Sequence, residues 1–97
     1  MRPVHLSDLH YAACTLQTHP AETQTAVLQS ALAKADTADR YRKRLRRAHP
    51  AYGTGTLTSA LAVAQPIDDT QTHSTAYLQA MLVVITGLLS RSARNKA

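Results

Sequence analysis

The feature that most constrains this chain is a long interval without helix-breaking residues. Neither glycine nor proline occurs between Pro20 and Pro50. This interval predicts a helix over Ala21–Arg47, on the order of 40 Å long at 1.5 Å per residue. Its apolar stripe shifts by roughly 120° between the two halves. Either the halves therefore pack on different neighbours, or the helix bends near Asp36–Asp39.

The end of this predicted helix carries most of the positive charge of the chain. Six of the eleven Lys and Arg residues lie within eight positions, namely Arg40, Arg42, Lys43, Arg44, Arg46 and Arg47. The remaining five bases are outnumbered by six acids, so the net charge of +5 is a local feature. Tyr41 and Leu45 fall between the bases on a helical wheel, and we assign them to packing.

Two acids precede bases by four residues within this segment. Asp36 is placed to pair with Arg40, and Asp39 with Lys43. Each such pair stabilises a helix by roughly 0.2–0.5 kcal/mol, and at least four bases are left without a local partner. The cluster is then a solvated helix face, a polyanion-binding site or a membrane-surface helix. The density of like charge favours a polyanion, because membrane helices usually offer Trp, Phe or several Leu on their apolar face.

The composition of the chain and the positions of its helix-breaking residues predict a small all-α protein. A chain of 97 residues is long enough for one domain with a modest core. It contains no Trp and no Phe. Helical periodicity, proline positions and capping residues, with Ser7 as the cap of the first helix, predict four helices in a single domain 1–97. The expected ranges are 8–18, 21–47, 57–65 and 75–90, followed by a frayed basic tail, 91–97.

The last predicted helix is the most apolar segment. A broad apolar arc is expected to form an oligomer interface through Tyr77, Leu78, Met81, Leu82, Ile85, Leu88 and Leu89. Small residues on the far side, Ala76, Ala80, Val83 and Gly87, would allow a second backbone to approach closely. A helix with so little polar surface is buried on most sides, and self-association is a natural way to achieve this in a short chain.

Patterns of catalysis or metal binding are not found. None of the five histidines is paired with Cys or a carboxylate at metal-ligand spacing, so we expect no metal, no cofactor and no enzyme activity. The single Cys14 cannot form an internal disulfide, and we interpret it as a small apolar residue. Gly53-Thr54-Gly55 lacks the lysine and preceding strand of a phosphate loop, which favours a simple turn.

Four segments together resemble one family of short proteins. They are Met1–Leu9, Ala35–Arg44, Arg47–Pro50 and Gly53–Leu57. They resemble the small terminase subunit of alphaproteobacterial gene transfer agents, which are phage-derived particles that package host DNA. This resemblance implies a homo-oligomer, commonly a ring, that binds double-stranded DNA and delivers it to the large terminase subunit. One departure is that a single short helix precedes the long one, so a full helix-turn-helix recognition domain does not fit.

The charge pattern and the resemblance together predict DNA binding through the six bases of the cluster, largely independent of base sequence. Alternatives are a small helical transcriptional regulator, an adaptor whose basic helix meets an acidic protein, and a peripheral membrane protein. We expect no membrane partner, because the apolar runs fall short of the roughly 18–20 residues of a span. The lone cysteine and the lack of a signal-peptide pattern indicate a reducing cytoplasm, and the resemblance implies that it is bacterial.

Overall fold

A computed structural model describes residues 1–61 and 74–96, with side chains described only as far as residue 93 in the second range. The elements are α1 (Leu6–Leu16), α2 (Ala21–Leu45), α3 (Leu57–Leu61) and α4 (Thr75–Lys96). Within these ranges there is no strand, and a lone bridge pairs His49 with Gly53. The protein is therefore all-α, as the sequence predicted.

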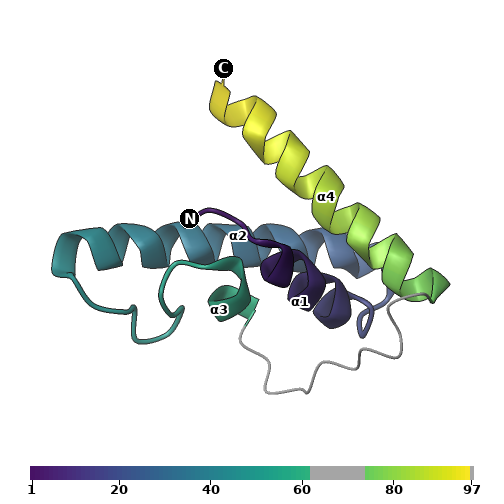
Figure 1. Cartoon of the computed structure of the whole chain (residues 1–97), viewed down its shortest axis with the longest axis horizontal. Coiled ribbons are helices and arrows are strands. Elements are labelled where there is room, and N and C mark those ends of the chain that lie inside the picture. Colours follow the sequence, from purple (N-terminus) through teal and green to yellow (C-terminus); the bar gives the residue numbers. More distant parts are fainter. Residues whose placement is uncertain (62–73, 97) are drawn as a thin grey trace.

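Helix α2 is the longest element, and the other three helices pack against it (Figure 1). It is a single helix whose buried residues follow one face from Gln24 to Asp39, whereas Tyr41 in its second half meets a different neighbour, the ring of His49. It ends at Leu45, two residues earlier than predicted, because Arg46 adopts a left-handed conformation with φ of 57°. The Arg46 N–H donates to the Arg42 carbonyl at 2.7 Å and closes the last turn. Arg46 and Arg47 consequently lie outside the helix on which the sequence analysis placed them.

Helix α1 begins at Leu6, with His5 rather than Ser7 at its N-cap position. The Asp8 side chain accepts the His5 backbone N–H at 2.9 Å, which satisfies one of the free donors at this end. The other carboxylate oxygen accepts both the backbone N–H and the hydroxyl of Thr58. Asp8 therefore attaches the start of α1 to α3, a contact that the sequence analysis did not predict.

The hydrophobic core lies where α1, α3 and α4 meet one side of α2. Its largest fully buried side chains are Leu16, Leu28, Leu57 and Val84. The spacing of Leu9, Ala12, Ala13 and Leu16 predicts one apolar face on α1. The last three of these residues are completely buried, which confirms that face. The rest of the cluster is small, and includes Ala31, Leu32, Leu61, Tyr77 and Ala80.

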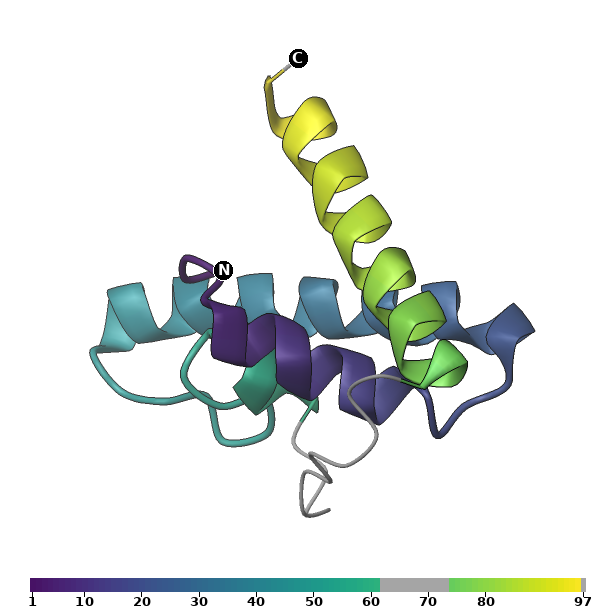
Figure 2. The same cartoon turned by 45° about the vertical axis from the view of Figure 1, so that its right-hand side comes forward.

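Helix α4 crosses the N-terminal half of α2, and its last turns project away from the body (Figures 1 and 2). It continues to Lys96, so residues 91–96 are helical rather than frayed. The close approach predicted for its small residues is made to α2 of the same chain. A Cβ atom added at Gly87 would lie 2.5 Å from Cδ2 of Leu28. The predicted end of α3, 62–65, lies outside the described residues.

One described helix has the length and composition needed to cross a membrane. The segment Thr75–Ala93 has a mean hydropathy of 1.3, and 17% of its apolar window is buried in the protein. No unbroken apolar run marks this segment, because Gln79, Thr86 and Ser90 interrupt it. Core helices of soluble proteins meet the same criteria, so this finding assigns no location.

Candidate functional site

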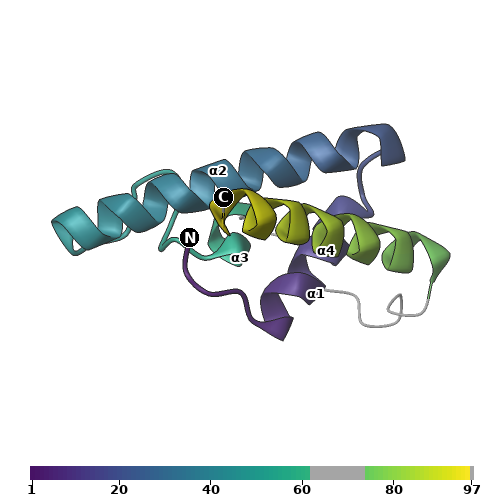
Figure 3. The same ribbon diagram turned by 90° about the horizontal axis from the view of Figure 1, so that it is seen from above.

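The basic cluster lies at the end of α2 that extends beyond α1 and α4 (Figure 3). The position follows from the fold, because α4 covers the opposite end of α2 and α1 packs near its middle. Solvent therefore surrounds much of the basic end. The structure divides the six predicted bases into two classes, according to whether a carboxylate already neutralises them.

Asp39 holds two of the six bases. Its carboxylate lies 3.0 Å from Arg42 Nη2 and 3.2 Å from Lys43 Nζ, so the predicted pair with Lys43 is confirmed. The Met1 amino group lies 3.3 Å away as a third cation. Burial raises the pKa of Asp39, but hydrogen bonds from Arg42, Lys43 and the Met1 amine outweigh burial and lower the pKa to about 2.

Asp36 does not pair with Arg40, contrary to the prediction from spacing. Its carboxylate instead binds the Met1 amino group at 2.7 Å and the guanidinium of Arg91 on α4. Burial raises the pKa of Asp36, and these hydrogen bonds outweigh it and lower the pKa. Arg40 is left exposed because two better-placed cations, one from the chain start and one from α4, occupy its expected partner.

The other four bases form the free positive surface of the cluster. They form no ion pair with any acid among residues 1–61 and 74–93, and all are exposed: Arg40, Arg44, Arg46 and Arg47. Within the described part of the chain, no acid pairs with this group to offset its positive charge. These four arginines can bind an anion, and the N–H donors of a guanidinium group match the geometry of phosphate oxygens.

The loop after α2 folds back and forms a wall beside these arginines. The His49 ring stacks on Tyr52 with centroids 4.5 Å apart, and Tyr41 meets it edge-on at 4.9 Å. Packing of Tyr41 is thus confirmed, whereas Leu45 remains 47% exposed and does not pack as predicted. The wall was not foreseen, because the sequence analysis assigned the loop no role beyond a turn.

The turn interpretation of the two glycines is confirmed. Gly53 and Gly55 have φ of 82° and 95°, which side chains other than glycine rarely adopt. At Gly55 the loop backbone approaches α2 so closely that a Cβ atom would lie 2.9 Å from the Asp39 Cα. The Gly55 carbonyl also accepts the Arg2 N–H at 2.8 Å. Glycine therefore permits the loop to dock beside the basic end of α2.

The predicted oligomer face of α4 is only partly available. Tyr77 is buried, and His10 Nδ1 lies 2.8 Å from its hydroxyl. Met81 and Leu88 also pack against the core. These three residues pack within one chain, where Tyr77 is buried and Met81 and Leu88 are half-buried. The other four predicted residues are exposed, namely Leu78 (57%), Leu82 (63%), Ile85 (41%) and Leu89 (66%).

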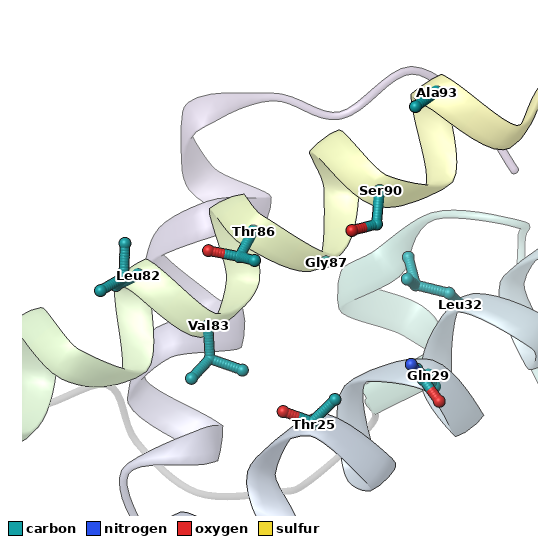
Figure 4. Close-up of a pocket in the computed structure, with 9 residues that line it drawn as sticks. All are labelled: Thr25, Gln29, Leu32, Leu82, Val83, Thr86, Gly87, Ser90 and Ala93. Atoms are coloured by element: carbon teal, nitrogen blue, oxygen red, sulfur yellow. The ribbon is translucent and has the colours of Figure 1, made fainter. Parts of the chain in front are cut away.

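A groove lies between α2 and α4, beside this exposed face (Figure 4). Its volume is ≈ 610 Å³, and its lining from the two helices is Thr25, Gln29, Leu32, Leu82, Val83, Thr86, Gly87, Ser90 and Ala93. None of these side chains carries a charge or a strong nucleophile. The groove can therefore contribute van der Waals contacts and hydrogen bonds, but it offers no acid–base chemistry.

One histidine–cysteine contact was missed by the sequence analysis. His10 and Cys14 are four residues apart on α1, and Nε2 lies 3.8 Å from Sγ. Their i,i+4 spacing is the signal that could have revealed the contact. Among the described residues no group of three or more potential ligands gathers around a metal position. The pair is thus a polar contact at the margin of the core.

A comparison with known proteins gives a family but no activity. The model of a family described as a domain of unknown function (DUF7742) matches residues 2–88, so the chain belongs to this family. The comparison found no matching curated protein. It also found no matching solved structure.

Proposed function

We propose that this member of the DUF7742 family is a DNA-packaging adaptor similar to a small terminase subunit. It would bind double-stranded DNA largely without regard to base sequence and deliver it to a large terminase subunit. The observation that carries the proposal is the group of four exposed arginines, Arg40, Arg44, Arg46 and Arg47, at the projecting end of α2. The resemblance of the first part of the chain to gene transfer agent terminases supplies the biological setting.

The charge distribution supports binding to the DNA backbone. Phosphate contacts by Lys and Arg release counterions, and log K then falls linearly with log salt at about −0.9 per phosphate contacted. Four free arginines predict a slope of about −3.6, and all six bases a slope of about −5.4. Because Asp39 holds Arg42 and Lys43, we expect the smaller slope.

The exposed face of α4 supports self-association. Leu78, Leu82, Ile85 and Leu89 are separated by four, three and four residues, the spacing of a coiled-coil seam. We propose that copies of the chain associate through these four residues and the neighbouring groove. An assembly, such as a ring, would repeat the basic ends of α2 and multiply a modest affinity for DNA.

The test is a variant with all six bases replaced by Gln, measured by fluorescence anisotropy on a labelled duplex across a salt series. We expect loss of binding at low salt and a wild-type circular dichroism spectrum. A Lys34→Gln variant, which removes one exposed base outside the cluster, should bind almost normally. A folded six-Gln variant that keeps full affinity at low salt would overturn the proposal.

A second candidate is an adaptor at an anionic membrane surface. The observation that favours it is the apolar segment Thr75–Ala93, which lies on the same chain as the basic cluster. Flotation with vesicles that contain anionic lipid separates the two functions. Binding to vesicles without binding to duplex DNA would favour the membrane over the packaging function.

A further inference from the structure

We infer that the end of α2 contains a discrete phosphate-binding pocket. Six residues line an open hollow of ≈ 670 Å³, namely Thr37, Arg40, Tyr41, Arg44, Leu45 and His49. The pocket rests on the proposed function in one respect, because we take the bound phosphate to belong to a DNA strand. It goes beyond that function because it assigns unequal roles to arginines that non-specific binding would treat alike.

The two arginines of the pocket have the right placement for one shared anion. Arg40 and Arg44 are four residues apart on α2, so their side chains start on the same face about 5–6 Å apart at Cβ. Both are exposed, and neither forms an ion pair with an acid of the described residues. Asp36, the nearest acid in spacing to Arg40, is already bound by the Met1 amine and Arg91.

The wall of the pocket is held in one arrangement before any ligand arrives. His49 Nδ1 accepts the backbone N–H groups of Ala51 and Tyr52 at 3.0 and 3.1 Å. In the neutral ring the proton therefore lies on Nε2, which can act as a donor. The ring is also held between Tyr41 and Tyr52. A ring donor held in place beside two guanidinium groups reduces the ordering cost of binding an anion.

The chemistry of the lining favours phosphate over other anions. Guanidinium groups bind phosphate oxygens through two parallel hydrogen bonds, and two arginines can share the oxygens of one phosphate. The rings of Tyr41 and His49 and the side chain of Leu45 form the less polar part of the lining. The C-terminus of α2 opposes an anion with about half a negative charge, but two full positive charges outweigh it.

A competing explanation is that the arginines only stabilise the end of the helix. Bases in the last turn interact favourably with its partial negative charge, typically by about 0.3–1 kcal/mol each. That explanation predicts a lower unfolding free energy when Arg40 and Arg44 are replaced, and no special loss of binding. Stability and binding must therefore be measured on the same variants.

The decisive comparison uses two double variants that lose equal charge. Arg40→Gln with Arg44→Gln removes the pocket arginines, and Arg46→Gln with Arg47→Gln removes the free pair outside it. All four side chains are exposed. We expect the pocket variant to lose at least about tenfold more duplex affinity than its control at matched salt, equivalent to about 1.4 kcal/mol. Equal losses in the two variants, with both folded, overturn the pocket and leave DNA binding standing.

A second measurement does not depend on DNA. Inorganic phosphate and a mononucleotide are titrated into the wild-type protein, and NMR follows the Arg Nε–H and His49 signals. We expect shifts at Arg40, Arg44 and His49 in the wild-type protein, and we expect the His49 shift to be lost in the pocket variant. A duplex without terminal phosphates, in the same titration, tests whether an internal phosphodiester suffices. Phosphate binding without duplex binding would refute the proposed function and retain the pocket.

Acetate at equal ionic strength is the chemical control of this titration. Equal shifts with acetate and phosphate would mean that the pocket accepts any small anion, including an acidic protein side chain, and would overturn the phosphate assignment. No shift at His49 or the two arginines with any phosphate compound would overturn the inference altogether.

Discussion

Replacing Asp39 by Asn should weaken the fold and strengthen DNA binding at the same time. Asp39 is 4% exposed and is contacted by Arg42, Lys43 and the Met1 amine. Its pKa falls from 3.8 to about 2. At 1.36 kcal/mol for each unit of pKa, this corresponds to about 2 kcal/mol of stability at neutral pH.

The sign follows from the direction of the shift. A carboxyl group whose pKa is lowered on folding contributes its full stability above the unfolded pKa of 3.8, and loses it as pH falls towards about 2. Urea unfolding at several pH values should thus show the wild type more stable than Asp39→Asn by about 2 kcal/mol at pH 7. The difference should vanish near pH 2. A difference that stays constant with pH would refute the linkage.

The same substitution should release Arg42 and Lys43 for contact with phosphates. The cations of these pairs are partly or largely exposed, and pairs screened by solvent contribute up to about 1 kcal/mol, so the affinity for a duplex should rise about two- to fivefold at low salt. Asp8→Asn is the matched control, because Asp8 is also buried and its pKa is also lowered, but it binds Thr58. It should lose stability without a gain in affinity. Unchanged affinity in a folded Asp39→Asn protein would show that Asp39 does not restrain these bases.

Two further substitutions test the loop and the apolar helix. Gly55→Ala should cost about 1–3 kcal/mol in urea unfolding, because φ is 95° and the new Cβ would meet Asp39. An unfolding free energy equal to wild type would contradict this reasoning. Replacing Leu78, Leu82, Ile85 and Leu89 by Gln should leave a folded chain, since all four are exposed, but should reduce the mass measured by light scattering at high salt. An unchanged oligomer would exclude this face as the interface.

Local signals were sufficient for the helices. The interval free of Gly and Pro predicted α2, and the spacing of Leu9, Ala12, Ala13 and Leu16 predicted the buried face of α1. The helix ends were predicted less accurately. The start of α1 at Leu6 depends on the conformation of His5, and the end of α2 at Leu45 depends on that of Arg46. The polar pattern of residues 91–96 indicated a frayed tail, yet α4 continues through them to Lys96.

The candidate site depended much more on contacts between distant segments. By spacing alone, the pair of Asp36 with Arg40 and the pair of Asp39 with Lys43 were equally favourable. The structure keeps only the second pair, because Arg91, 55 residues away, and the Met1 amine bind Asp36. The wall formed by His49 and Tyr52 likewise exists only because Gly55 lets the loop dock on α2.

The sequence by itself determined that this protein is helical, where its long helix lies and where its positive charge gathers. Each of these properties depends on neighbours within one or two helical turns. Only the tertiary structure decided which bases remain free and which face of α4 is covered. Periodicity shows that α4 is apolar on most sides, but not that Tyr77, Ala80 and Val84 face the core while Leu82 and Leu89 face solvent. That choice depends on how α4 packs on α1 and α2, segments that lie far away in the chain.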